Sequence, residues 1–378
     1  MPGQRRRICF VAPMAWSVLA RDRAVPLVGG AEVQQAALAR ELARRGHEVS
    51  MVCLDHGQPE GVVIDGVRVH RMHAPGAGLP VLRFLHPGAS SVWRAMARAD
   101  AEIYYQRSAG AMTAIVTAFA RSHRRLAVYA SACDLDFDPA VPLVQYGRDR
   151  VLYRWGLRHA DAVVAQTARQ QRDCRAGYDI EATRIDSCHP NEAASARQTG
   201  DVIWVGTIKA LKRPELLVEL ARRLPDVRFR LIGAGSAGAV QALRSGGIPP
   251  NVQVVGFVAH ADVGVHFDGA SVLVNTSTAE GFPNTFLQAW SRGVPTLAFF
   301  DPEVRFEGAH LSETAQSLDE MVQRLKRLKS DAAHWTGVSL HARRGFERQF
   351  SVGMAVDRYE ALFDRVAQAR DAAQGARA

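Results

Sequence analysis

The sequence at residues 270–295 reads ASVLVNTSTAEGFPNTFLQAWSRGVP. The apolar run 270–275 predicts a buried strand, and the polar residues after it predict a loop. A helix is expected to begin at Pro283, because the missing N–H of proline costs nothing at a first helical position. Phe286 and Trp290 lie four residues apart and give that helix an apolar face. Strand, loop and helix in this order indicate an α/β protein.

The loop before this helix is a candidate anion site. The first N–H groups of a helix and the positive end of its dipole point at whatever sits in front of them. A phosphate is the natural ligand there, which makes Pro283, Asn284 and Thr285 candidate binding residues. One acidic residue, Glu280, stands in the loop, and Gln288 follows eight positions later. Ordinary α/β architecture without a ligand is the alternative.

Strand-like and helical patterns alternate along the first half of the chain. The predicted strands are residues 8–12, 48–54, 62–64, 67–71, 103–106, 126–131 and 162–166. Helical stretches separate most of them, and a long loop at 13–28 could close over a substrate. Such alternation predicts a parallel sheet covered on both faces. Residues 189–200 are polar without periodicity and predict a linker.

The same alternation restarts after this segment. The predicted strands of the second half are residues 202–205, 229–232, 252–255, 272–275 and 296–300. A final helix, from about 351 to 369, has no strand after it. We therefore predict an α/β fold of two doubly wound, Rossmann-like domains, 1–190 and 201–350, facing a cleft. Ligands of such sheets bind at the carboxyl ends of the strands.

Two glycine-rich segments come after predicted strands, the first of them after the long loop 13–28. Gly29 and Gly30 open a helix, where the backbone can approach an anion closely; a tight turn is the alternative. Residues 233–238, GAGSAG, match the dinucleotide fingerprint G-x-G-x-x-G. In a dinucleotide-binding fold an acidic residue at the end of the next strand holds the ribose. Here that strand is followed by Gly256 and Phe257, and neither is acidic. A loop lining a nucleotide cleft is therefore favoured over an oxidoreductase.

The loop 206–213, GTIKALKR, follows the first strand of the second domain and is cationic. It holds two of the chain's four lysines, Lys209 and Lys212, beside Arg213. Lysine as a point charge and arginine as a fork suit a diphosphate. A solvated surface loop is the alternative.

Composition limits the possible partners. The chain has 378 residues, 47% of them hydrophobic, and five cysteines without paired spacing, which indicates reduced thiols in a cytoplasmic protein. Residues 1–190 carry 25 Arg, no Lys and 18 Asp or Glu. This excess suggests a membrane surface or a phosphorylated acceptor; a solvated arginine-rich face is the alternative. No motif indicates nucleic acid, a metal site or a membrane-spanning segment.

These motifs resemble the retaining glycosyltransferases of family 4, whose second domain carries EGFP-x-x-x-x-E-A. Glu280, Gly281, Phe282, Pro283 and Ala289 fit this pattern, and Gln288 departs from it. The resemblance implies the GT-B fold, with the first Glu on the donor sugar's hydroxyls and the second on the ribose. The final helix, within 351–378, is then expected to pack back on the first domain.

The family also shows Gly-Arg at the position of Gly206 and Thr207, with a Lys five residues after the Arg. Lys212 fits, and Lys209 or Arg213 could supply the charge that Thr207 lacks. The resemblance implies these donor-binding candidates: Gly29, Gly30, Gly206, Thr207, Lys209, Arg213, Gly233, Gly235, Gly256, Phe257, Gly281, Phe282, Pro283, Asn284, Thr285 and Gln288.

The implied activity is transfer of a hexose from a nucleotide diphosphate sugar to a saccharide or lipid-linked acceptor, without metal or cofactor, in surface polysaccharide or glycolipid synthesis. The catalytic candidates are Glu280, Lys212 and Asp134. Many relatives keep a His near the Asp-x-Asp at 134–136, but none occurs between 124 and 158. Asp134 is therefore the candidate for a sugar or acceptor contact. A nucleotide-sugar 2-epimerase and a non-catalytic nucleotide-sugar binder stay open.

Overall fold

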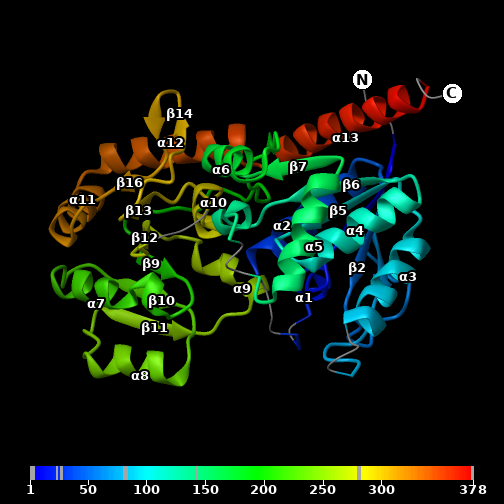
Figure 1. The fold of residues 1–378 in the computed structure, drawn as a ribbon. Coiled ribbons are helices and arrows are strands. Elements are labelled where there is room, and N and C mark those ends of the chain that lie inside the picture. The colour runs from blue at the N-terminus through cyan, green and yellow to red at the C-terminus, as the bar shows by residue number, and fades with distance from the viewer. Residues whose placement is uncertain are drawn as a thin grey trace. The chain divides into compact units, whose positions relative to one another are not determined.

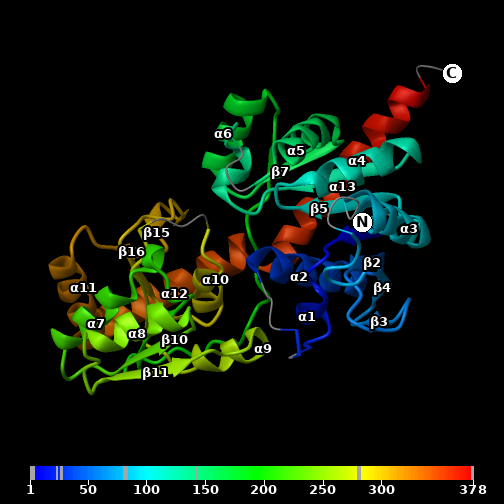
Figure 2. The same ribbon diagram turned by 60° about the horizontal axis from the view of Figure 1, so that its bottom comes forward.

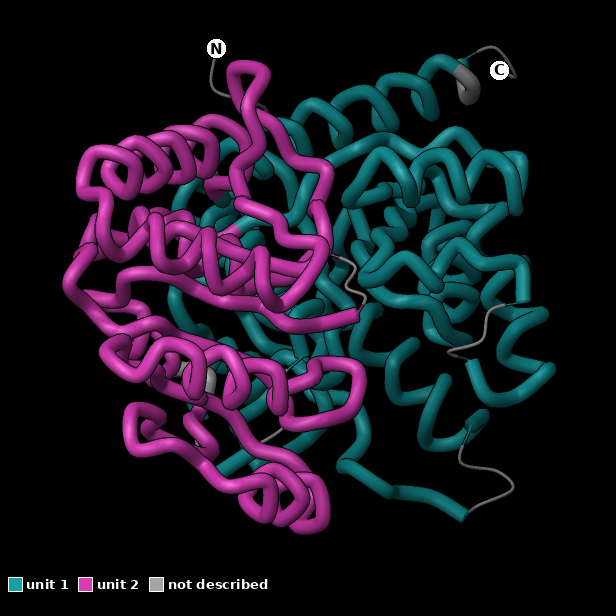
Figure 3. The backbone as a smooth tube through the Cα atoms, turned by 90° about the vertical axis from the view of Figure 1, so that its left-hand side faces the viewer, with its two compact units in different colours: residues 1–188, 352–378 teal, residues 189–351 magenta. Residues whose placement is uncertain are grey.

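The computed structural model describes residues 5–22, 24–25, 29–79, 84–140, 144–278 and 282–375. The chain forms two compact units (Figure 3). Unit 1 comprises residues 1–188 and 352–378, and unit 2 comprises residues 189–351. Within the described residues, no helix is both long and apolar enough to cross a membrane.

Unit 1 is built on an eight-stranded sheet with the order β3-β4-β2-β1-β5-β6-β7-β8. Neighbouring strands are parallel except β3 and β4. The strands are β1 Arg7–Val11, β2 Glu48–Cys53, β3 Val63–Ile64, β4 Val67–Arg71, β5 Ile103–Arg107, β6 Leu126–Ala130, β7 Ala162–Ala165 and β8 Thr183–Arg184.

Helices cover both faces of this sheet (Figure 1). They are α1 Trp16–Leu19, α2 Gly30–Arg44, α3 Ser90–Ala99, α4 Ala111–Ser122, α5 Gly147–His159, α6 Ala168–Tyr178 and α13 Val352–Gly375. Ile8 and Phe10 pack with α2 and α13, whereas Cys9 and Val11 pack with α3 and α4. This is the alternation of side chains along a strand.

Helix α13 joins unit 1 through buried and charged contacts. The hydroxyls of Tyr105 and Tyr359 lie 3.1 Å apart, and Arg45 Nη1 lies 2.8 Å from the Glu360 carboxylate. Arg6 contributes a further ion pair, at 2.6 Å from Asp364. These contacts hold the middle of α13 against β5 and the end of α2, and Figure 2 shows α13 running beside them.

Unit 2 is built on a six-stranded sheet with the order β11-β10-β9-β12-β13-β16. All of its neighbouring strands are parallel. They are β9 Val202–Val205, β10 Phe229–Ile232, β11 Val252–Gly256, β12 Val272–Asn275, β13 Thr296–Ala298 and β16 Glu313–Thr314. A separate hairpin joins β14 Arg305–Phe306 to β15 Ala309–His310.

The helices of unit 2 also lie on both faces of its sheet. Helices α7 Pro214–Arg222, α8 Ala237–Ser245 and α11 Leu318–Ser330 share one apolar core with the sheet. The other core contains α10 Asn284–Trp290 and α12 Ala332–Gln349, and the short α9 His260–Val263 adjoins it. The predicted fold class, two doubly wound α/β units, is confirmed.

Two local expectations differ from the structure, and a third segment makes contacts that its sequence does not indicate. Residues 13–28 were expected to form a loop, but their described part contains α1. Pro283 is the extended residue before α10 and not its first helical residue. The polar segment 189–200 has no helix, yet it is bonded into unit 2: the N–H groups of Ser195 and Ala196 both donate to the carbonyl of Arg292. Backbone pairing of this kind leaves no periodicity in a sequence.

Candidate functional site

The strand order of unit 2 reverses between β9 and β12. From β9 the chain proceeds outward through β10 and β11, and then returns to β12 on the other side of β9. Ligands of open parallel sheets bind at such a switch point, outside the carboxyl ends of the strands. The segments to consider are therefore 206–213, after β9, and 276–283, after β12.

The glycine loops after β9 and β10 interlock through their backbones. The Gly206 N–H donates to Ile232 at 3.0 Å, and the Ile208 N–H donates to Ala234 at 2.8 Å. Gly233 has φ +149°, and a Cβ atom added there would collide with the carbonyl oxygen of Gly206. At Gly235 an added Cβ would collide with the carbonyl oxygen of Ile208. Close packing of two loops thus explains the G-x-G spacing without a dinucleotide.

The loop after β9 is also tied to the loop after β12. The Arg213 guanidinium donates from Nε to the Thr276 carbonyl at 2.7 Å and from Nη2 to the Ser277 carbonyl at 3.2 Å. The Thr276 hydroxyl accepts from Trp204 Nε1 at 2.9 Å and lies 2.7 Å from the Lys212 carbonyl. Arg213 itself has φ +45°, a conformation that such ties must hold in place. The guanidinium of Arg213 therefore positions the two loops.

The β9 loop also carries two lysines, Lys209 and Lys212, which are its candidate phosphate ligands. Lys209 is exposed, as is Thr207, and Lys212 is half-buried at the end of a short 3-10 helix, Ala210–Lys212. The Thr278 N–H donates to the Leu211 carbonyl at 3.1 Å, so the β12 loop runs beside the lysines. An ammonium on a fixed loop at the switch point is suited to a diphosphate.

The signature loop is described only in part. Glu280 and Gly281 lie outside the described residues. Phe282 stacks on Phe350 with ring centroids 5.3 Å apart, which anchors the chain entering α10. Helix α10 has seven residues and begins at Asn284, followed by Thr285.

The remaining donor candidates of unit 2 occupy different environments. Gln288 is buried within α10. Gly256 has φ +86°, and its carbonyl accepts from the Gly233 N–H at 2.9 Å, so the β11 loop joins the same edge. Phe257 beside it is exposed, which leaves an aromatic face at this edge of the sheet.

Unit 1 has its own switch point, between β1 and β5. Gly29 is the extended residue before α2, and Gly30 is its first helical residue. At the end of β5 the sequence does not indicate a functional residue, yet Arg107 lies there with 7% exposure. Its Nη1 donates to Gln34 Oε1 at 3.3 Å. The next residue, Ser108, has φ +81°, a backbone strain that is common at functional sites.

The two carboxylates of the Asp-x-Asp segment lie in different surroundings. Asp134 accepts from Gln170 Nε2 at 3.0 Å and lies 3.7 Å from Arg169. Asp136 is buried, and burial raises its pKa despite a hydrogen bond from the Ala132 N–H. Among the described residues, no three His, Cys, Asp or Glu side chains gather as metal ligands. Asp134 is the more accessible carboxylate of the pair.

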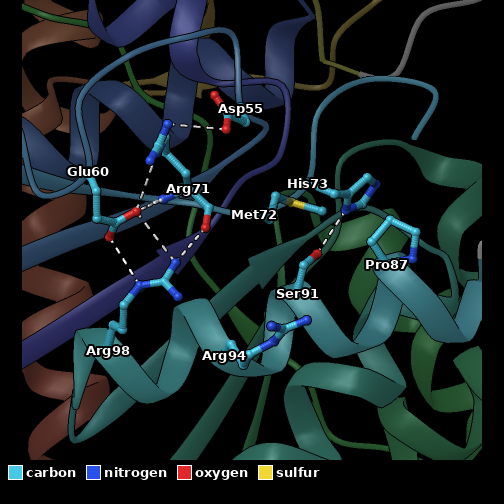
Figure 4. Close-up of a pocket in the computed structure, with 9 residues that line it drawn as sticks. All are labelled: Asp55, Glu60, Arg71, Met72, His73, Pro87, Ser91, Arg94 and Arg98. Carbon is cyan, nitrogen blue, oxygen red and sulfur yellow. Dashed lines mark hydrogen bonds and ion pairs between the residues drawn. The ribbon is translucent and has the colours of Figure 1, made fainter. Parts of the chain in front are cut away.

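A polar pocket of about 400 Å³ opens where β2 and β4 end beside α3 (Figure 4). Arg71 lies 3.3 Å from the Asp55 carboxylate and 3.7 Å from Glu60. Arg98 reaches the same Glu60 at 3.1 Å. Burial alone would raise the pKa of Glu60, but hydrogen bonds from the Arg71 N–H, His70 and Arg98 lower it. Arg94 stands apart from this cluster.

The other side of this pocket carries a hydroxyl and an imidazole. His73 Nδ1 lies 2.9 Å from Ser91 Oγ, and burial lowers the pKa of His73, which favours the neutral ring. The pocket therefore holds three arginines against two carboxylates, Asp55 and Glu60. Such a mixture can bind hydroxyl groups together with a single anionic group. No sequence motif marks this pocket, because its residues come from three separated segments.

Two family models match the chain. "Glycosyl transferase 4-like domain" matches residues 29–191, and "Glycosyl transferases group 1" matches residues 199–331. The chain is also similar to D-inositol 3-phosphate glycosyltransferases of Mycobacterium bovis and Mycobacterium tuberculosis, at 26% identity over 197 residues. That match covers 46% of this chain and 40% of the relative.

Solved structures of low identity share the fold. HepE of Anabaena, solved in complex with UDP and glucose, has a TM-score of 0.72 at 15% identity, covering 95% of this chain and all of that one. Sucrose-phosphate synthase of Thermosynechococcus elongatus has a TM-score of 0.73 at 16% identity, covering 97% and 100%.

Proposed function

Because this chain belongs to the family 4-like glycosyltransferases of the GT-B fold, we propose that it transfers a hexose from a nucleotide diphosphate sugar. The observation that carries the proposal is the switch point of unit 2. There the lysine-bearing loop after β9 is fixed by Arg213 to the loop after β12. The Anabaena structure with UDP and glucose supports a nucleotide-sugar donor for a protein of this fold.

The lysines would act on the leaving group. Negative charge develops on the nucleotide diphosphate as the glycosidic bond breaks, so Lys212, with Lys209, would stabilise the transition state more than the ground state. The backbone N–H groups of Asn284 and Thr285, which follow Pro283 at the start of α10, would add donors. Glu280 would orient the hydroxyls of the donor sugar. This chemistry requires no divalent cation or cofactor, because the lysines supply the counter-charge.

Retention of the anomeric configuration follows from attack on the face that the leaving group occupies. In this mechanism the departing phosphate oxygen accepts the proton of the acceptor hydroxyl. No protein base is then needed beside the anomeric carbon. Asp134 would contact a hydroxyl of the acceptor or of the donor sugar from the edge of unit 1.

The acceptor is proposed to be a saccharide or a lipid-linked saccharide used in surface polysaccharide or glycolipid synthesis, in the cytoplasm. The polar pocket of Figure 4 would hold its hydroxyl or phosphate groups, because arginines and carboxylates line it together. The mycobacterial relatives are named for a phosphorylated polyol, which fits an excess of arginine over carboxylate.

The proposal is tested by incubating the protein with UDP-, GDP- and ADP-sugars. A donor that binds the folded state raises the thermal midpoint by mass action. Chromatography of the products then separates sugar transfer from epimerisation and from binding alone. We expect one nucleotide class to stabilise the protein and to release its nucleotide when an acceptor is present. An epimerised donor, or binding without turnover with any acceptor, would contradict the proposal.

A further inference from the structure

A second pocket in unit 1, of about 500 Å³, is lined by apolar side chains from α3, α4 and α5. Helix α4 contributes Ile115 and two alanines to its lining, and α3 contributes Trp93. Helix α5 contributes Val151 and Trp155. Val151 is 64% exposed and Trp155 is 39% exposed, so the apolar surface continues from the pocket onto the outer face of α5.

The two tryptophans of this pocket differ from the others of the chain. Trp16, Trp204, Trp290 and Trp335 each donate their indole N–H to a protein oxygen. Within the described part of the chain, the indole N–H groups of Trp93 and Trp155 have no such acceptor. A tryptophan with an apolar contact and an unbonded N–H is suited to the interface between hydrocarbon and water.

The charge around the pocket is strongly one-sided. Helices α3, α4 and α5 carry seven arginines and a single acidic residue, Asp149, which pairs with Arg148 at 2.8 Å. Two of the seven, Arg94 and Arg98, line the polar pocket, and the other five lie elsewhere on these helices. The arginines are Arg94, Arg98, Arg121, Arg148, Arg150, Arg154 and Arg158. Arg148 lies at the rim of the pocket itself, with its guanidinium carbon 3.7 Å from the centre of the Phe84 ring. These three helices carry six more positive than negative charges, and residues 1–190 as a whole carry seven more. Nearly all of the excess positive charge of this part of the chain therefore lies on α3, α4 and α5.

The apolar pocket and the excess of arginine on its helices together indicate the class of partner. A protein partner that filled the pocket would need an acidic surface beside an apolar side chain, whereas an anionic bilayer supplies both hydrocarbon and phosphate. We propose that α3, α4 and α5 dock unit 1 on an anionic membrane, with lipid chains entering the pocket and lipid phosphates binding the rim arginines. This docking goes beyond sugar transfer and does not depend on it.

The test measures binding of the whole protein to vesicles without any nucleotide sugar. Vesicles of phosphatidylglycerol and phosphatidylcholine are compared with vesicles of phosphatidylcholine alone. We expect co-sedimentation with the first only, falling as salt is raised, because phosphate contacts at the surface are screened. Lipids brominated in their acyl chains should quench part of the tryptophan fluorescence, and Trp155→Phe should reduce that quenching.

Variants separate insertion from simple adsorption. Val151→Asp places a charge at the pocket mouth on an exposed residue, and it should lower vesicle affinity about tenfold or more. Val63→Asp, on the exposed side of β3 in the same unit, is the matched control and should leave affinity unchanged. Arg148→Gln with Arg158→Gln should weaken binding and reduce its dependence on salt.

Three results would overturn the proposal. Equal vesicle binding by wild type and Val151→Asp would mean that the arginines adsorb without the pocket. Absence of quenching by brominated chains would exclude insertion. If wild type is a dimer by sedimentation and Val151→Asp is a monomer, with neither bound to vesicles, the pocket is an interface with a second copy of the chain.

Discussion

The switch point of unit 2 and the pockets of unit 1 are built from different parts of the polypeptide. In unit 2, carbonyls and N–H groups of neighbouring loops pack directly against each other. The loops are so close that a Cβ added at Gly233 would collide with the carbonyl oxygen of Gly206. In unit 1, the polar and apolar pockets are made by side chains that project from α3 and its neighbours. Backbone packing restricts residue type to glycine, whereas side-chain packing tolerates many combinations. The first kind of site therefore tolerates substitution less than the second.

The largest expected effect is on the interlocked glycines. Gly233→Ala forces a Cβ against the Gly206 carbonyl at a φ that alanine avoids, and we expect it to lower the free energy of unfolding by about 3 kcal/mol. Gly238→Ala is the matched control from the same motif, because it lies in α8 with open space around it. That change should be neutral or stabilising by about 0.5–1 kcal/mol. Equal urea midpoints for the two variants would contradict the interlocking.

Next in size is the removal of the half-buried ammonium of the β9 loop. Lys212→Ala should weaken binding of a nucleoside diphosphate by about 1.5–3 kcal/mol, as expected for a charge-assisted hydrogen bond. Lys326→Ala, an exposed lysine of α11, is the control and should bind as wild type does. Calorimetry that finds no difference between the two variants would indicate that Lys212 does not contact the diphosphate.

A smaller effect is expected at Gln288, where the chain departs from its family. An amide can donate to and accept from the two ribose hydroxyls, so Gln288→Glu exchanges the amide for a charge that binds more strongly but also repels a diphosphate. Transfer should change less than tenfold, or about 1.4 kcal/mol. Gln288→Leu should cost more, because it leaves the ribose unpaired. Steady-state kinetics that rank the two variants in the opposite order would exclude this contact.

The smallest effect separates two arginines of the polar pocket. Arg98 is bound to Glu60 and to the Arg71 carbonyl, so Arg98→Gln should lower the free energy of unfolding by about 0.5–1 kcal/mol. Arg94 stands apart from that cluster and is exposed. Arg94→Gln should leave stability unchanged and raise only the KM for the acceptor. A loss of stability in Arg94→Gln, without a change in KM, would remove it from the acceptor site.

The contrast between backbone packing in unit 2 and side-chain packing in unit 1 also explains what the sequence can predict. Strands β9, β10 and β12 have the predicted bounds, because short runs of buried apolar residues end at turn residues. The glycine and lysine motifs of unit 2 are contiguous, so they were visible as candidates. The tie from Arg213 to Thr276 joins residues 63 apart, and no local pattern records it.

The polar pocket and the buried arginine of unit 1 also depend on residues that are far apart in the sequence. Asp55, Arg71 and Arg98 meet only after β2, β4 and α3 have packed. Arg107 ends a strand whose five residues are all buried, which is a signal that could have been used: an arginine within a buried strand needs polar partners. The segment 189–200 gives no sequence signal of its contacts with unit 2, because the N–H groups of Ser195 and Ala196 pair with the carbonyl of Arg292 whatever their side chains are.

Glu280→Gln tests the proposed donor site most directly. Transfer of a labelled hexose and calorimetric binding of the nucleotide are measured on the same wild-type and variant proteins. If Glu280 orients the donor sugar, transfer should fall about a hundredfold or more, as when one transition-state contact is removed, while nucleotide affinity stays unchanged. Equal losses of transfer and nucleotide affinity, or no loss of either, would contradict a donor site at this edge of unit 2.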